Sequence, residues 1–186
     1  MSAPIHTSAF IGVSVDGFLA RPDGALDFLP EGGGEDHGYA EFFATVNALV
    51  IGRKTYETVL GFPEWPYGGK PVIVLSTRPL TMPSASVASV ERMDGDPAVV
   101  LSRLAARGIR HVYVDGGLTI QAFLAAGRLD RLVITRVPVL IGAGIPLFGA
   151  LPADIRLRHV STRSFPSGLV TTEYAVASLA PEGEGS

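Results

Sequence analysis

Two segments of the sequence place glycine and threonine directly after an apolar stretch, a pattern suited to binding phosphate. Residues 47–51 lead into Gly52–Thr55, and residues 111–114 lead into Asp115–Thr119. Apolar side chains at helical spacing follow, so each segment predicts a strand that runs directly into a helix. A helix that begins at glycine offers unpaired N–H groups at the positive end of its dipole, and no side chain blocks an approaching anion. Two such junctions in one chain favour a ligand with several phosphates, and therefore a nucleotide cofactor.

The composition favours a small enzyme that acts on a small molecule. The chain has 186 residues, of which 47% are hydrophobic, a formal net charge of −3 and no cysteine. This length suffices for one well-filled core, and the mild charge offers no basic surface for DNA or RNA. The absence of cysteine excludes disulfides, thiolate catalysis and cysteine-based metal sites, and we expect no metal.

The sequence predicts neither secretion nor a membrane span. The N-terminus lacks a basic segment followed by an apolar stretch, so a signal peptide is not expected. The uncharged residues 137–153 are too short to cross a bilayer and are interrupted by glycine and proline, which indicates a strand end leading into a loop. We therefore expect a cytoplasmic protein, in line with the lack of cysteine.

Strands and helices are expected to alternate along most of the chain. Strands are predicted at 8–14, 47–51, 70–75, 87–90, 111–114 and 131–137, helices around 39–46, 56–60, 97–108 and 120–127, and a closing antiparallel hairpin at 155–164 and 169–178. Parallel α/β units with an antiparallel finish predict a mixed, mostly parallel sheet flanked by helices. We expect one domain, residues 1–180, and a disordered tail, residues 181–186.

Four motifs occur in the order found in dihydrofolate-reductase-like proteins: Ser14–Gly17, Ile51–Glu57, Val74–Pro79 and Val114–Gly117. The sequence is more similar to the reductase domain of the bifunctional deaminase-reductases of riboflavin biosynthesis, particularly to their stand-alone relatives. The similarity covers residues 8–178. It implies a three-layer α/β fold with a mixed eight-stranded sheet, NADPH as the hydride donor, and a homodimer.

The cofactor candidates follow from residue chemistry together with this resemblance. Arg53 and Lys54 would destabilise a helix start unless an anion lies there, although they could also form a solvated basic surface. Arg78 lies where similar proteins hold the adenosine 2′-phosphate, although residues 76–79 could also be an ordinary turn. The full set of cofactor-binding candidates is Gly17, Gly52, Arg53, Lys54, Thr55, Ser76, Thr77, Arg78, Gly116, Gly117, Leu118 and Thr119.

The second junction, Asp115–Thr119, differs from the corresponding segment of related folds at one position. The resemblance implies a cis peptide bond between Gly116 and Gly117, where glycine lets the backbone approach a pyrophosphate closely. Asp115 stands where related folds often have a third glycine. Its charge would be unfavourable beside phosphate unless the side chain points away, for example to cap the helix at Leu118 and Thr119.

The sequence indicates the part of the site around the nicotinamide and the substrate less clearly than the part around the phosphates. Residues 14–28 are similar to the mobile loop that closes over the nicotinamide in this fold. Dihydrofolate reductases carry a carboxylate on the first helix, but the matching position here falls near Gly38 or Tyr39. The catalytic candidates are Asp16, Asp27 and Glu41, each of which could equally be a turn or surface carboxylate. The substrate-binding candidates are Tyr39, Phe42 and Thr135, the last of which could equally be a buried strand threonine.

These observations predict an NADPH-dependent reductase that acts on a small heterocyclic or sugar-like molecule. The resemblance makes a ribosylamino-pyrimidine the first expected substrate. Dihydrofolate reduction is the alternative reaction. A non-catalytic NADPH sensor is the alternative class, in which side chains such as Tyr39, Phe42 or Trp65 would fill the substrate space.

Overall fold

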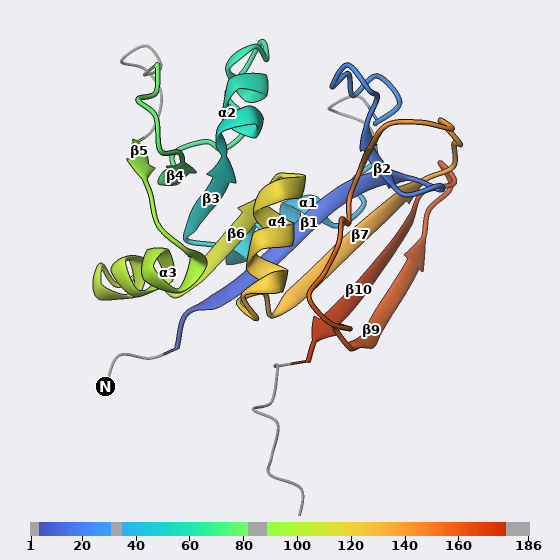
Figure 1. Ribbon diagram of the computed structural model, residues 1–186. Helices are drawn as coiled ribbons and strands as arrows, with labels where there is room; N and C mark the ends of the chain where they lie inside the picture. Colours follow the sequence, from blue (N-terminus) through green and yellow to red (C-terminus); the bar gives the residue numbers. More distant parts are fainter. Residues whose placement is uncertain (1–3, 31–34, 82–88, 178–186) are drawn as a thin grey trace, which may run out of the picture.

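The computed structural model describes residues 4–30, 35–81 and 89–177 (Figure 1). In this part of the chain eight strands form one sheet, in the order β5-β4-β3-β6-β1-β7-β10-β9, and two short strands pair separately. The large sheet contains β1 (His6–Ser14), β3 (Ala48–Gly52), β4 (Val72–Leu75), β5 (Val90–Met93), β6 (His111–Asp115), β7 (Arg131–Val137), β9 (Leu157–Ser164) and β10 (Val170–Val176). The short pair contains β2 (Phe18–Ala20) and β8 (Ile145–Pro146).

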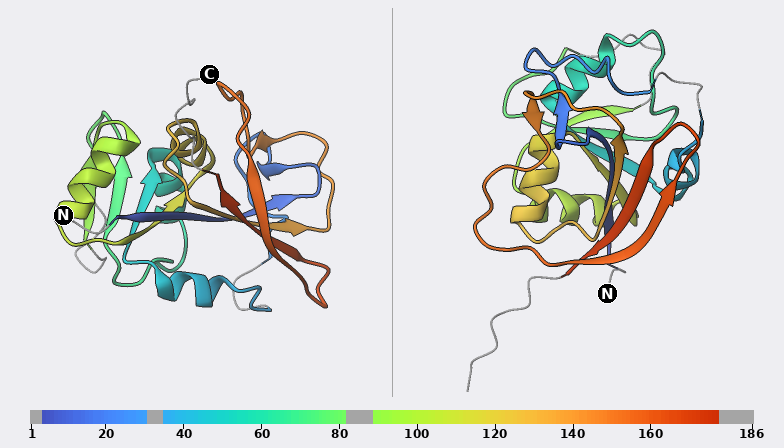
Figure 2. Two further views of the ribbon diagram at one scale, coloured as in Figure 1. Left: turned by 90° about the horizontal axis from the view of Figure 1, so that it is seen from below. Right: turned by 90° about the vertical axis from the view of Figure 1, so that its right-hand side faces the viewer.

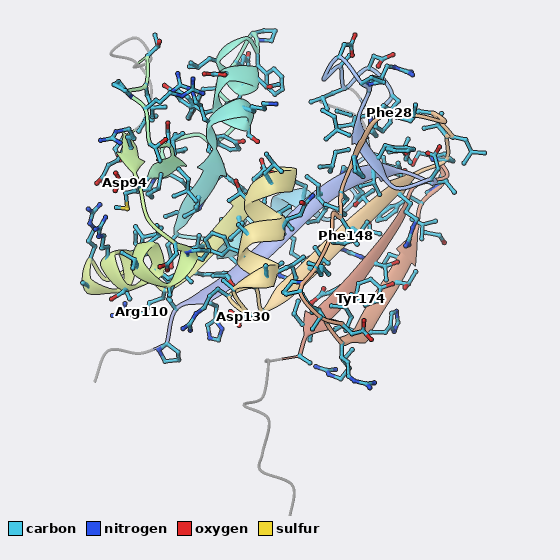
Figure 3. The ribbon with its side chains drawn as sticks, in the orientation of Figure 1. Phe28, Asp94, Arg110, Asp130, Phe148 and Tyr174 are labelled. Atoms are coloured by element: carbon cyan, nitrogen blue, oxygen red, sulfur yellow. The ribbon has the colours of Figure 1, made fainter. Side chains whose placement is uncertain are left out.

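The sheet is parallel from β5 to β7 and antiparallel from β7 to β9. Parallel strands end at the same edge, so the segments that follow β1, β3, β4 and β6 meet there. Phe28 lies beyond this edge, whereas Arg110 and Asp130 lie at the opposite edge, where β6 and β7 begin (Figure 3). Ligands of open parallel sheets bind beyond the carboxyl ends of the strands, which directs attention to the first edge.

Within the described residues, four helices accompany the sheet: α1 (Tyr39–Thr45), α2 (Arg53–Leu60), α3 (Pro97–Ala106) and α4 (Gly117–Ala125). Helices α3 and α4 lie on one face of the sheet, and α1 lies on the other (Figure 2). The predicted three-layer α/β fold is therefore confirmed. The predicted start of α3 is also confirmed, because the Asp96 carboxylate accepts hydrogen bonds from the N–H groups of Ala98 and Val99 at 2.9 and 3.1 Å.

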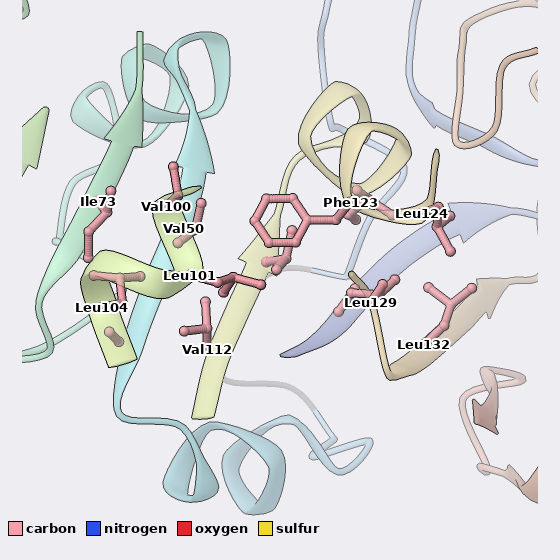
Figure 4. Packing of buried hydrophobic residues seen from close by; sticks show 14 of the residues in the cluster. Val50, Ile73, Val100, Leu101, Leu104, Val112, Phe123, Leu124, Leu129 and Leu132 are labelled. Atoms are coloured by element: carbon pink, nitrogen blue, oxygen red, sulfur yellow. The ribbon is translucent and has the colours of Figure 1, made fainter. Parts of the chain in front are cut away.

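Each face of the sheet has its own hydrophobic core. On the α3–α4 side, strand residues such as Val50 and Val112 pack against Leu104 and Phe123, all fully buried (Figure 4). On the α1 side, Phe10, Leu49, Tyr113 and Phe42 form the second core, which also receives Tyr56 and Val59 of α2. The alternation of side chains along β6 follows from this arrangement: Val112 and Val114 face α4, whereas Tyr113 and Asp115 point toward the α1 side.

Some sequence predictions differ from the structure. Strands β2 and β8 lie in segments rich in glycine and proline that were expected to be loops. The strand predicted at 87–90 overlaps residues outside the described ranges, and β5 begins at Val90. The predicted tail, residues 181–186, lies outside the described residues. Among the helices of the described chain, none has the length and apolar character needed to cross a bilayer.

Candidate cofactor and substrate site

The two predicted strand-to-helix junctions lie side by side and interlock. A Cβ atom added to Gly52 would stand 2.8 Å from the Thr119 hydroxyl, and one added to Gly116 would collide with the Thr55 hydroxyl. Gly116 also has a φ of +97°, a backbone conformation that favours glycine. Each threonine of one helix therefore occupies the space left by the glycine of the other, and only glycine allows the two helix starts to approach this closely.

Neither helix start is capped by a side chain. Helix α2 follows Gly52 and α4 follows Gly116, and neither start has a side-chain cap hydrogen bond. The first N–H groups of the two helices therefore remain available to an anion. The expected cis bond is not observed, because every peptide bond in the described residues is trans. Leu118, a predicted cofactor contact, is highly exposed in the first turn of α4.

The segment that follows β4 is attached to the first junction by Arg53. Its guanidinium donates hydrogen bonds to the Pro79 carbonyl at 2.8 Å, the Ser76 hydroxyl at 3.3 Å and the Glu57 carboxylate at 2.7 Å. The Ser76 hydroxyl in turn accepts the Arg78 N–H at 3.1 Å. The structure thus brings together the predicted cofactor-binding segments 52–55 and 76–78. The Arg53 guanidinium, however, already donates its hydrogen bonds to groups of the protein.

Two other predicted basic residues keep their charges exposed. Lys54 and Arg78 are exposed, and within the described residues neither forms an ion pair. Thr77, between Ser76 and Arg78, is exposed as well. Arg92 supports the segment by donating to the Ser76 carbonyl at 3.0 Å. The site therefore combines free N–H groups with free cationic side chains, which suits a ligand bearing several phosphates.

The loop after β1 covers the second junction. A Cβ on Gly117 would collide with Leu19 of β2, so this side chain lies directly on the glycine. The Gly17 carbonyl accepts the Leu147 N–H at 3.0 Å and its own N–H donates to Ser14 at 2.9 Å, which leaves Gly17, a predicted cofactor contact, fully engaged within the protein. The β2 and β8 segments therefore form one unit above the site.

Asp16 holds this unit together. Its carboxylate accepts the N–H groups of Gly142 and Ile141 at 2.8 and 3.3 Å. The Ser14 hydroxyl, followed by these two N–H groups, holds the pKa of Asp16 below its usual value. The side chain is thus ionised at neutral pH, which suits an anchor better than a proton donor.

We expect Asp16→Ala to loosen the segment around residues 139–147 while leaving the fold intact. Loss of two acceptor contacts should raise amide hydrogen exchange at Gly142 by about tenfold. Asp23→Ala is the matched control, because Asp23 accepts only the nearby Ala25 N–H within the same loop. Unchanged exchange at Gly142 in Asp16→Ala would show that Asp16 does not anchor this segment.

The other two predicted catalytic carboxylates lie elsewhere. Asp27 is exposed and pairs with Arg21 at 2.6 Å, and this hydrogen bond lowers the pKa of Asp27. Glu41 faces β9 and stands 3.9 Å from Arg163. The structure therefore brings neither Asp27 nor Glu41 to the helix starts, and their catalytic roles stay predictions.

Asp115 is the carboxyl group that the structure places at the junction itself. Its side chain does not cap α4, in contrast to the expectation from the sequence. Its carboxylate accepts the Gly116 N–H at 2.8 Å and the Tyr67 hydroxyl at 3.0 Å. Burial raises the pKa of Asp115, and the two hydrogen bonds offset only part of that increase.

Tyrosine side chains surround Asp115. Burial and the charge of Asp115 raise the pKa of Tyr39, Tyr67 and Tyr113, so these hydroxyls stay protonated. Tyr113 donates to the Phe10 carbonyl at 2.8 Å, and the Tyr39 ring lies 6.3 Å from the Tyr113 ring. Tyr39, a predicted substrate residue, thus lies near Asp115, whose pKa burial raises above its usual value.

The other two predicted substrate residues have structural contacts. Phe42 is buried in the α1-side core, between Phe10 and Tyr113. The Thr135 hydroxyl lies 2.9 Å from the Thr171 hydroxyl, and both residues are buried. Sequence reasoning missed Tyr67 and its hydrogen bond to the buried Asp115 carboxyl group. The alternation along β6, which puts Tyr113 and Asp115 on one face, was the available signal.

The fold and the glycine-rich edge define a dihydrofolate-reductase-like reductase domain. The chain belongs to the RibD C-terminal domain family, whose model matches residues 6–171. The protein YwjB of Bacillus subtilis is 35% identical over 162 residues, which cover 86% of this chain and 91% of that protein. The homodimer implied by the resemblance stays a prediction.

Solved structures show the same fold. A protein of Shewanella sp. PV-4, described as a riboflavin biosynthesis protein, is 35% identical with a TM-score of 0.85, covering 93% of this chain and 99% of that one. The bifunctional deaminase and 5-amino-6-(5-phosphoribosylamino)uracil reductase of Thermotoga maritima is 14% identical with a TM-score of 0.72, covering 94% of this chain and 57% of that one. Dihydrofolate reductase of Enterococcus faecalis, complexed with NADP(H), is 19% identical with a TM-score of 0.60. The match covers 92% of this chain and 94% of that one.

Proposed function

We propose that this chain is an NADPH-dependent reductase that delivers a hydride to a carbonyl or imine carbon of a small heterocyclic substrate. A ribosylamino-pyrimidine, the substrate class named for the Thermotoga maritima enzyme, is the first candidate. The observation that carries the proposal is the pair of interlocked, uncapped helix starts at Gly52 and Gly116. They offer N–H groups to a pyrophosphate from two neighbouring strands of one sheet.

The side chains at the carboxyl edge of the sheet suit the phosphate groups of this cofactor. Thr55 and Thr119 add hydroxyls between the two helix starts. Lys54 and Arg78 offer free positive charge next to them, with Arg78 on the segment that Arg53 holds in place. When bound, NADPH supplies the hydride, and the reduction of a carbonyl or imine also consumes one proton.

Asp115 is the residue proposed to supply that proton. A carboxyl group with a raised pKa carries a proton at a higher pH than an exposed carboxylate does, and Asp16 and Asp27 have lowered pKa values. Tyr67 fixes one Asp115 oxygen and the Gly116 N–H fixes the other, so the carboxyl group is held in one orientation. Leu19 of β2 covers Gly117 next to this carboxyl group.

Turnover assays test the proposal. Purified chain is mixed with NADPH and either the ribosylamino-pyrimidine, with or without its phosphate, or dihydrofolate, and nicotinamide absorbance is followed. Saturable oxidation of NADPH with a pyrimidine supports the proposal. Oxidation with dihydrofolate alone would assign the alternative reaction, and NADPH binding without any turnover would favour a sensor.

Arg78→Ala should weaken NADPH binding by about 10- to 100-fold and NADH binding by less than about threefold, because only NADPH carries the 2′-phosphate that Arg78 would contact. Fluorescence titration with both nucleotides measures the two constants. Arg158→Ala removes the same charge from the distant strand β9 and should leave both constants unchanged. Equal losses for NADPH and NADH in Arg78→Ala would remove the 2′-phosphate role.

A further inference from the structure

Helix α2 is attached to the segment that follows β4 at two separate points. Arg53, in the first turn of the helix, donates to the Pro79 carbonyl at 2.8 Å. One turn further along, the Tyr56 hydroxyl donates to the Thr81 carbonyl at 2.7 Å. Residues three positions apart lie on one face of a helix, so Arg53 and Tyr56 hold two successive parts of the same backbone. Segment 76–81 is therefore fixed relative to the start of α2.

Tyr56 reaches this segment from the core of the molecule. Only 1% of its surface is exposed, and its ring lies edge-on to the Trp65 ring at a centroid distance of 6.5 Å. Leu80, between the two held carbonyls, packs against the same hydrophobic cluster. Burial raises the pKa of Tyr56, so the hydroxyl stays protonated and acts as a donor. Because a close-packed ring has little freedom to move, its hydrogen bond holds Thr81 in one place.

The hydrogen bonds that hold this segment leave the Arg78 side chain free. The Arg78 N–H donates to the Ser76 hydroxyl at 3.1 Å, and the Ser76 N–H donates to the Met93 carbonyl at 3.0 Å. The Arg78 carbonyl accepts from Arg53 at 3.4 Å. Within the described parts of the chain, the Arg78 guanidinium itself forms no ion pair. The structure thus fixes the backbone that carries a free cationic group.

We propose that Tyr56 is a positioning residue for the 2′-phosphate of NADPH and acts through Arg78, an inference that rests on the proposed function. The N–H groups at the start of α2 would bind the pyrophosphate, and Tyr56 on the same helix holds the backbone of Arg78. The spacing of the two phosphate sites is therefore set before the nucleotide arrives. A site ordered in advance binds more tightly, because less freedom is lost on binding.

Tyr56→Phe tests this role, since it removes the hydroxyl and keeps the ring. Thr81 is exposed, so water can replace the lost hydrogen bond to its carbonyl and the variant should fold, which melting curves check. We expect about three- to tenfold weaker binding of NADPH, the usual effect of one lost hydrogen bond, and less than about a twofold change for NADH. Isothermal titration measures both constants without relying on Trp65, which contacts Tyr56.

Thr58→Val is the matched control on the same helix. The Thr58 hydroxyl also donates to a main-chain carbonyl, that of Lys54 at 2.9 Å, but this acceptor lies within α2. The control should therefore leave the affinities for NADPH and NADH unchanged.

The double variant Tyr56→Phe with Arg78→Ala shows whether Tyr56 acts through Arg78. Once Arg78 is gone, loss of the Tyr56 hydroxyl should weaken NADPH binding by less than about a further twofold. The same loss with and without Arg78 would overturn the proposal. Equal losses for NADPH and NADH in Tyr56→Phe would overturn it as well.

Hydrogen exchange in the nucleotide-free chain distinguishes failure of this inference from failure of the proposed function. Tyr56→Phe should raise exchange of the Arg78 N–H by about tenfold, and Thr58→Val should not. Unchanged exchange at Arg78 in Tyr56→Phe overturns the positioning role, whether or not the parent chain binds NADPH. A parent chain that shows no preference for NADPH over NADH would overturn the proposed use of NADPH, and this inference with it.

Discussion

Asp115→Asn is expected to lower kcat by about 10²- to 10⁴-fold, the usual contribution of a positioned general acid. Asparagine has nearly the same shape. Its oxygen can accept the Gly116 N–H and its amide group can donate to the Tyr67 oxygen, so the local structure should persist. Affinity for NADPH should change little, because both oxygens of the Asp115 carboxyl group are engaged by protein donors, Tyr67 and the Gly116 N–H. Steady-state kinetics and nucleotide titration of the variant measure both quantities.

The same variant should be more stable than the parent at neutral pH. Burial raises the pKa of Asp115 in the folded chain above its unfolded value. A group of this kind contributes stability that is fully present below the unfolded pKa and is lost as pH rises through the folded pKa. Removing the ionisable group should therefore increase the free energy of unfolding at pH 7 by about 1 kcal/mol. Reduced stability together with full activity would contradict the role of Asp115.

Tyr67→Phe provides the control that separates a proton donor from a structural carboxylate. The Tyr67 hydrogen bond lowers the pKa of Asp115, so its loss should raise that pKa further. If Asp115 supplies the proton, the pH above which kcat falls should then move to a higher value. A merely structural Asp115 would change kcat in Tyr67→Phe without shifting the pH profile.

Gly116→Ala is expected to abolish nucleotide binding and to destabilise the fold by about 3 kcal/mol or more. Alanine at a φ of +97° costs about 1–2 kcal/mol, and its methyl group would collide with the Thr55 hydroxyl. Relief of the collision would separate the two helix starts. Denaturant unfolding and nucleotide titration of the variant measure the two effects.

Gly108→Ala isolates the backbone part of this effect. Gly108 has a φ of +84°, and an added Cβ would meet nothing within 4 Å. This variant should lose only about 1–2 kcal/mol and keep its nucleotide affinity. Combining Gly116→Ala with Thr55→Ala should recover part of the stability, because the colliding hydroxyl is gone. Strict additivity of these two substitutions would show that the junctions do not interlock.

The two glycine-led helix starts proposed to bind phosphate could be predicted because local sequence determines them. A glycine at a strand end and a helical pattern after it place N–H groups at a known edge of a parallel sheet, wherever the rest of the chain lies. Both junctions therefore lie next to each other as predicted. The Asp96 cap and Pro97 at the start of α3 are local features of the same kind.

The surroundings of the candidate proton donors could not be predicted from local sequence, because contacts between residues distant in sequence determine them. Asp115 gains its raised pKa from burial and its orientation from Tyr67, 48 residues away in the sequence. The Asp16 carboxylate accepts N–H groups 125 and 126 residues away, contacts that the local sequence does not indicate. Equally, the short strands β2 and β8 exist because they pair with each other, although each is too short and too rich in flanking glycine to be recognised alone.

Titration of the folded chain with NADPH, followed through the fluorescence of its single tryptophan, tests the central claim most directly. Trp65 packs against Tyr67 at a ring distance of 5.3 Å, and Tyr67 donates to Asp115, so the fluorophore adjoins the site. The account predicts saturable quenching with a Kd of about 1–10 μM for NADPH, at least tenfold tighter than for NADH. No saturable change up to about 1 mM NADPH, with the chain fully folded, would contradict it.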